Sequence, residues 1–192
     1  MGRYEIRLSG AGGQGLILAG FILAEAVVRF TDQEVIQTQS YGPEARGGAS
    51  KAEVIISDEE IDYPQVTKPD FLLALTQEAY NKYNRDLKEY GTMIVDERVD
   101  AAFRGGPTYV VPIQRKTQER LGTRLVVNVV SLALFNHLHE VVPVDKLQEA
   151  VLERVPRGTE DLNKKALELG QELAQELNTY KVFREEEEVE DE

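Results

Sequence analysis

The sequence predicts an α/β fold in which flanking helices cover a mostly parallel sheet and helices form the C-terminal third. Three observations support this prediction. Segments of strand length alternate with helical segments over residues 4–113. A glycine-rich turn joins the first strand to the first helix, and helical periodicity dominates after residue 114. Strands that alternate with helices pair in parallel through right-handed crossovers.

The first strand is predicted at residues 4–9, where apolar and polar side chains alternate, and helical spacing from Leu16 to Val27 follows the glycine turn. Nearly all-apolar segments at residues 70–75 and 92–96 indicate strands that are covered on both faces. The remaining strands are predicted at residues 34–38, 50–57 and 109–113, and the remaining helices at residues 77–87, 117–121, 126–138, 144–155 and 160–177.

Composition limits the possible functions. The formal net charge is −12, and seven of the negative charges lie in residues 185–192, so the rest of the chain carries about −5. We therefore expect one domain over residues 1–180, a disordered acidic tail over residues 181–192, and no nucleic-acid partner. No apolar run is long enough to span a membrane, and the start lacks the pattern of a secretory signal, so we expect a cytoplasmic protein.

The glycine turn Gly10-x-Gly12-x-x-Gly15 fits the dinucleotide fingerprint and predicts a Rossmann-like start. Backbone N–H groups and the helix dipole favour an anion at such a turn. The fingerprint also requires an acidic residue at the end of the second strand, where this chain has glutamine and threonine at residues 37–39. This argues against a freestanding nicotinamide dehydrogenase. Two interpretations stay open: a phosphate contact, or glycines that only permit a tight turn and close packing.

A second motif, residues 41–48, contains Pro43, which fixes its backbone φ angle, and several glycines that permit unusual conformations. Arg46 precedes Gly47 and Gly48, where its planar guanidinium can bind a phosphate or carboxylate that approaches the backbone closely. The alternative is a surface ion pair with Glu44.

These two motifs carry a family resemblance. The segments GAGGQGLILAG, TQSYGPEARGGASKAEVIIS, PDFLLALTQEAYNKY and GTMIVDERV resemble the gamma subunit of the 2-oxoacid:ferredoxin oxidoreductases, most closely the 2-oxoglutarate type. The resemblance covers residues 3–99 and continues more loosely to about residue 177. The acidic tail lies outside it.

The resemblance implies a complex that uses thiamine diphosphate with Mg²⁺ and [4Fe-4S] clusters to convert a 2-oxoacid and coenzyme A into an acyl-coenzyme A, with ferredoxin as electron acceptor. It also implies alpha, beta and ferredoxin-like delta subunits as partners, contact with ferredoxin only through them, and an inactive isolated chain. The sequence has no cysteines to hold clusters, and no Gly-Asp-Gly stretch with a following asparagine to hold magnesium diphosphate. Residues near coenzyme A would be Gly12, Gly13, Gln14, Arg46, Gly47 and Gly48.

Two other function classes stay open: a scaffold subunit with an empty glycine turn, and an independent nucleotide-dependent α/β enzyme. No metal site is expected, because His137 and His139 are two residues apart on a predicted helix and point in different directions. Asp96 and Glu97 are expected in a turn or helix cap, Asn128 in a hydrogen bond within the core or at a subunit contact, and Tyr80 and Tyr83 either in the core or at an interface.

Overall fold

The computed structural model describes residues 2–40, 48–103 and 105–181. Their strands are β1 (Tyr4–Ala11), β2 (Glu34–Ser40), β3 (Ala49–Ser57), β4 (Phe71–Ala74), β5 (Thr92–Asp96) and β6 (Thr108–Val111). The α-helices are α1 (Leu16–Phe30), α2 (Gln77–Tyr83), α3 (Ile113–Leu121), α4 (Val127–His139), α5 (Val144–Arg154) and α6 (Glu160–Gln175), and the 3₁₀ turns are η1 (Asn84–Asp86) and η2 (Leu177–Tyr180). The predicted order of strands and helices is confirmed.

The strands form one six-stranded sheet in the order β2-β3-β1-β4-β5-β6. Strands β1, β4, β5 and β6 pair in parallel, whereas β3 is antiparallel to both of its neighbours, β1 and β2. The reversal of β3 follows from its connection, because residues 41–48 are too few for the crossover that parallel neighbours need. The predicted mostly parallel sheet is therefore confirmed, with β3 as the one reversed strand.

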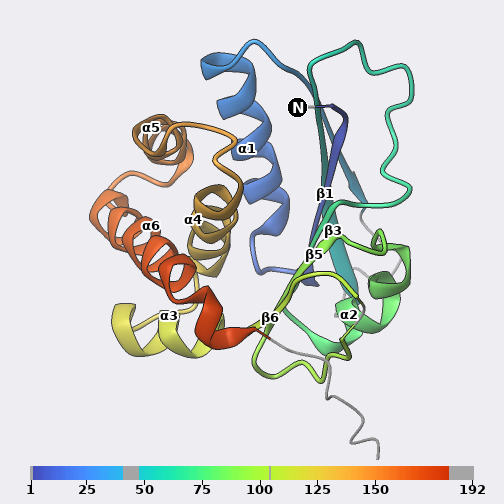
Figure 1. Cartoon of the computed structure of the whole chain (residues 1–192). Coiled ribbons are helices and arrows are strands. Elements are labelled where there is room, and N and C mark those ends of the chain that lie inside the picture. The colour runs from blue at the N-terminus through green and yellow to red at the C-terminus, as the bar shows by residue number, and fades with distance from the viewer. Residues whose placement is uncertain (1, 41–47, 104, 182–192) are drawn as a thin grey trace, which may run out of the picture.

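Helices cover both faces of the sheet, as predicted. Figure 1 shows α1 and α3 to α6 on one side and α2 on the other. The side chains of Ile6, Leu8, Phe71 and Leu73 point from the sheet into the larger core beneath α1 and α4. A smaller core beneath α2 contains Leu72 and other apolar side chains of β4 and β5. This double coverage explains why β4 is apolar at every position.

Helices α4 and α6 touch almost backbone to backbone. A Cβ atom added at Gly170 of α6 would overlap the Val130 carbonyl oxygen and would lie 2.6 Å from the Ala133 Cβ, both on α4. Glycine at this position therefore sets the separation of the two helices.

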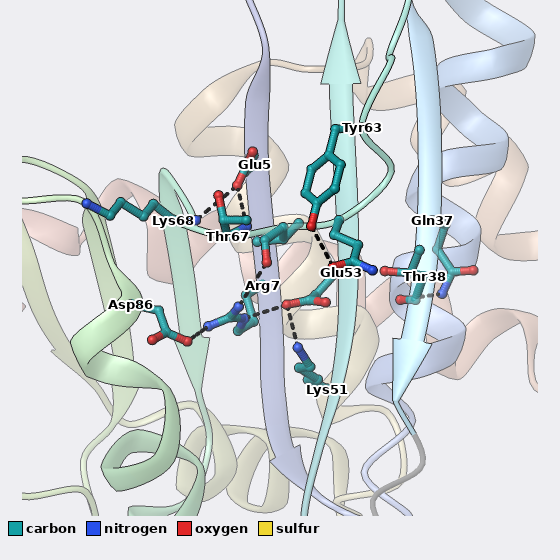
Figure 2. Close-up of polar contacts among 12 residues, drawn as sticks. Glu5, Arg7, Gln37, Thr38, Lys51, Glu53, Tyr63, Thr67, Lys68 and Asp86 are labelled. Atoms are coloured by element: carbon teal, nitrogen blue, oxygen red, sulfur yellow. Dashed lines mark hydrogen bonds and ion pairs between the residues drawn. The ribbon is translucent and has the colours of Figure 1, made fainter.

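On the α2 side, the middle of the sheet carries an ionic cluster around the buried Arg7 and Glu53 side chains (Figure 2). Arg7 donates to Glu53 at 2.7 Å and to Asp86 at 2.6 Å, and Lys51 donates to Glu53 at 2.8 Å. The Arg7 guanidinium also lies over the Tyr83 ring, 5.2 Å from its centroid. Because the Arg7 side chain is only 3% exposed, these partners compensate the cost of removing its charge from water.

The connection over residues 58–70, between β3 and β4, also lies on the α2 side of the sheet, where side chains of the β1 segment hold it (Figures 1 and 2). Arg3 donates to the Tyr63 carbonyl oxygen at 2.8 Å and to that of Gln65 at 2.9 Å. Glu5 accepts from the backbone N–H of Thr67 at 3.0 Å. A connection without helix or strand is thus fixed by polar contacts to β1 and to Arg3, which directly precedes it.

The predicted acidic tail, residues 181–192, lies outside the described residues except for Lys181, which forms an isolated antiparallel bridge with Tyr109 of β6. None of the described helices is long and apolar enough to cross a membrane.

Candidate ligand site at the glycine turn

The glycine turn lies at the carboxyl ends of β1 and β4, where ligands gather in open α/β sheets. Ala11, the last residue of β1, pairs with Ala49, the first residue of β3. Half-buried Gly48 directly precedes Ala49, so the sheet brings Gly48 beside the turn. The described ends of the two sequence motifs therefore meet at one edge of the sheet.

Gly12 and Gly13 form the open part of this turn, and both are exposed. Gly13 has a φ of 86°, a left-handed conformation that favours glycine. Gly12 has no such φ, and a Cβ atom built there meets no atom of the described chain within 4 Å. Neither conformation nor packing within the described residues explains glycine at position 12. Its missing side chain leaves a backbone that the described residues do not cover.

Gly10 and Gly15 are explained by packing. A Cβ atom at Gly10 would overlap Oε1 of Gln14, and one at Gly15 would lie 2.7 Å from Nδ2 of Asn128. Gly15 also has a φ of 73°. At these two positions the structural interpretation of the fingerprint glycines accounts for the residue.

The N-terminus of α1 favours an anion. Gly15 is its N-cap and provides no side-chain hydrogen bond, and the first turn of the helix contains no acidic residue. The first N–H groups of a helix lack partners within that helix, and its dipole places partial positive charge at this end. A phosphate at this position would therefore meet backbone donors and no carboxylate from the first turn of α1.

Gln14 points into the turn. Its Oε1 accepts from the Ala11 N–H at 2.7 Å, and its Nε2 donates to Oε1 of Gln114 at 3.4 Å. The Gln14 N–H donates to the Ala11 carbonyl oxygen at 3.3 Å. Gln14 thus stabilises the turn from within.

Of the predicted coenzyme A residues, Gly12, Gly13, Gln14 and Gly48 gather at this edge, whereas Arg46 and Gly47 lie outside the described residues. The sequence did not single out Gln114, which joins the site from α3. Its only signal is an amide side chain two residues after Pro112, which directly follows the last strand.

The other weighed residues have structural roles. Asp96 accepts from the Gln114 N–H at 2.9 Å and so caps α3, as predicted. Asn128 donates to the Gly15 carbonyl oxygen at 3.2 Å, which confirms a hydrogen bond within the core. Tyr80 and Tyr83 are buried in the core beneath α2 rather than displayed as an interface patch.

His139 lies in a cluster of aromatic side chains. His139 lies 3.2 Å from the Tyr4 hydroxyl and packs against Phe71 and Phe135. Burial lowers the pKa of His139 to about 4, so its ring is neutral near pH 7. Among the described residues, no group of three or more His, Cys, Asp or Glu side chains is placed to hold a metal ion.

The strand, glycine turn and helix at residues 4–30 begin an α/β domain in a Rossmann-like way. The chain belongs to the pyruvate ferredoxin/flavodoxin oxidoreductase family, whose model matches residues 5–173.

The 2-oxoglutarate synthase subunit KorC of Methanocaldococcus jannaschii is 48% identical over 179 residues, which cover 91% of this chain and 96% of that protein. The pyruvate synthase subunit PorC of Methanothermobacter marburgensis is 30% identical over 172 residues, which cover 88% of this chain and 96% of PorC. Among solved structures, the keto/oxoacid ferredoxin oxidoreductase gamma subunit of Geobacter sulfurreducens is 46% identical with a TM-score of 0.83, and the match covers 95% of this chain and 100% of that one. Each of these relatives is a subunit of a larger enzyme.

Proposed function

We propose that this chain is the gamma subunit of a 2-oxoglutarate:ferredoxin oxidoreductase. The complex would convert 2-oxoglutarate, coenzyme A and oxidised ferredoxin into an acyl-coenzyme A, CO₂ and reduced ferredoxin. The observation that carries this proposal is the 48% identity with KorC along nearly its whole length, against 30% with PorC. The preference for 2-oxoglutarate over pyruvate rests on this difference.

In this proposal the redox chemistry belongs to the partner chains. A sequence without cysteine has no thiolate ligand for an iron–sulfur cluster, so the [4Fe-4S] clusters would lie on other subunits. Thiamine diphosphate and Mg²⁺ would also be held there, on alpha, beta and ferredoxin-like delta subunits, which pass electrons on to ferredoxin.

The part played by this chain would be to form the coenzyme A side of the active site. Three features support this role: the open backbone at Gly12, the uncapped N-terminus of α1, and the absence of an acidic residue from its first turn. The backbone N–H groups of the turn would bind a phosphate of coenzyme A, and Arg46 would add a charged donor beside Gly48. The chain would bind and orient coenzyme A without taking part in the electron transfer.

The isolated chain is expected to be inactive with 2-oxoglutarate, coenzyme A, thiamine diphosphate, Mg²⁺ and a low-potential electron acceptor. Activity should appear only after it is combined with its partner subunits, measured as acyl-coenzyme A formation. Turnover by the pure chain would instead support an independent α/β enzyme. If the partner subunits were equally active with and without this chain, the chain would be no more than a dispensable scaffold.

Arg46→Ala is expected to raise the KM for coenzyme A roughly 10- to 100-fold in the reassembled complex. This range corresponds to the loss of a hydrogen bond to a charged group, about 1.5–3 kcal/mol, with a factor of ten for each 1.4 kcal/mol. The KM for 2-oxoglutarate should stay nearly unchanged, and Arg46→Lys should recover only part of the loss because an ammonium group lacks the planar fork. Steady-state kinetics with each substrate varied separately provide the measurement.

The matched control is Arg157→Ala, which removes an exposed arginine from the link between α5 and α6 and should leave both KM values unchanged. Gel filtration of each reassembled complex separates a binding defect from an assembly defect. Equal losses toward both substrates, or no loss toward either, would reject the contact between Arg46 and coenzyme A and favour the ion pair with Glu44.

A further inference from the structure

Buried Gln114 connects the glycine turn to the rest of the sheet edge. It is 5% exposed, and its Nε2 donates to the Leu75 carbonyl oxygen at 2.8 Å. Its Oε1 accepts from Nε2 of Gln14, whose own Oε1 accepts from the Ala11 N–H. Its backbone N–H donates to Asp96, which is completely buried at the end of β5. Two side-chain amides therefore bridge the ends of β1 and β4, and Asp96 ties Gln114 to β5.

The direction of this bridge is determined at both ends. The Leu75 carbonyl can only accept a hydrogen bond, so the NH₂ group of Gln114 must face it and its oxygen must face Gln14. The Ala11 N–H can only donate, so the oxygen of Gln14 must face the turn and its NH₂ group must face Gln114. Reversing either amide would set two donors or two acceptors against each other. Gln114 thus selects the one orientation in which Gln14 can hold Ala11.

Gly10 provides independent support, because a Cβ atom there would clash with the Gln14 Oε1. The backbone of β1 is therefore shaped to admit this amide oxygen. The contacts with Gln114 and Ala11 and the space at Gly10 are therefore all consistent with one position of the Gln14 amide.

We propose that Gln114 is a positioning residue for the glycine turn: through Gln14, it holds residues 11–15 in the conformation that presents backbone N–H groups to coenzyme A. This inference rests on the proposed coenzyme A role of the turn. Gln114 is not assigned any contact with the ligand, and it acts only through the side chain of Gln14.

The first test measures the turn without ligand, by NMR hydrogen exchange of the Ala11 amide in the full chain. Gln14→Met removes the direct acceptor and should speed exchange about three- to tenfold, as expected for the loss of one hydrogen bond. Gln114→Met should speed it in the same direction, although Gln114 does not touch Ala11. The double variant should exchange no faster than Gln14→Met alone, because both changes break the same bridge.

The matched control is Thr117→Val, one turn further along α3. Thr117 is completely buried and its hydroxyl donates to the Ile113 carbonyl oxygen, with no link to the turn. This change should lower stability without altering Ala11 exchange. If Gln114→Met also left Ala11 exchange unchanged while Gln14→Met raised it, the positioning role would be overturned.

A reciprocal measurement covers the case in which Gln114→Met does not fold. Gln14 is only half-buried, so Gln14→Met is expected to fold, and it should shift the side-chain NH₂ resonances of Gln114. Unshifted resonances would show that the two amides are not coupled and would reject the proposal.

The second test measures function in the reassembled complex. Gln114→Met and Gln14→Met should each raise the KM for coenzyme A about two- to tenfold and leave the KM for 2-oxoglutarate unchanged, because each weakens or removes the one hydrogen bond that holds the Ala11 N–H. Faster Ala11 exchange with unchanged coenzyme A kinetics in both variants would uphold the positioning of the turn and reject the proposed coenzyme A role. A rise in the coenzyme A KM for Gln14→Met alone would reject the positioning role and uphold the function.

Discussion

Arg7→Ala is expected to lower the free energy of unfolding by about 3 kcal/mol, the lower end of the range for breaking a buried ion pair. The variant leaves Glu53, whose side chain is 9% exposed, without its closest charged partner. The loss stays near the lower end because Lys51 remains 2.8 Å from Glu53. At roughly 2–4 °C per kcal/mol for a chain of this size, the melting temperature should fall by about 6–12 °C in thermal unfolding followed by circular dichroism.

Arg115→Ala is the matched control, because Arg115 is half-exposed and pairs with Glu97 at the surface. It should change the melting temperature little, since exposed pairs are screened by water. The double variant Arg7→Met/Glu53→Leu should be more stable than Arg7→Ala, because it no longer leaves the buried Glu53 carboxylate without Arg7. Equal effects of Arg7→Ala and Arg115→Ala would show that burial adds nothing to the Arg7 cluster.

Gly170→Val is expected to cost at least about 3 kcal/mol, the upper end of the usual range for overpacking. The added carbons meet the Val130 carbonyl oxygen and the Ala133 Cβ of α4. A flexible side chain could move aside, but a backbone atom can yield only if the two helices separate. Valine is a better helix former than glycine by a few tenths of a kcal/mol, which is too little to offset this cost. Urea unfolding of the full chain provides the measurement.

Glu168→Val introduces the same side chain on the exposed side of α6 and should cost only a few tenths of a kcal/mol in helix propensity. Gly170→Ala should fall between the two valine variants. If Gly170→Val were as mild as Glu168→Val, α4 and α6 would be able to move apart freely, and the close contact would not limit stability.

Local pattern was enough to predict most of the fold. The apolar run of β4 indicates a strand that is buried on both faces. This pattern can be recognised without knowing which strands or helices lie next to it. The glycine turn and its helix were likewise visible, because the spacing of Gly10, Gly12 and Gly15 expresses a local backbone requirement. These features depend on residues close together in the chain.

Contacts between distant residues were not predictable in this way. Arg7 pairs with Asp86, 79 positions away, and Gln14 meets Gln114, 100 positions away. An isolated arginine or glutamine in the sequence does not indicate which partner the fold will bring to it. The sequence also could not distinguish the roles of Gly10 and Gly12. In the structure, a side chain at position 10 would be crowded, whereas one at position 12 would meet no described atom.

The two faces of β1 differ so much in polarity that the strand can pair with its neighbours in only one register. Its even-numbered residues Ile6 and Leu8 enter the apolar core, and its odd-numbered residues Glu5 and Arg7 bind charged or polar partners on the other side. Slippage by one residue would exchange these faces and turn Arg7 toward α1, among apolar side chains. It would also withdraw Glu5 from the connection that it holds. Misaligned pairing of the central strand is therefore opposed by electrostatics on one face and by lost apolar burial on the other.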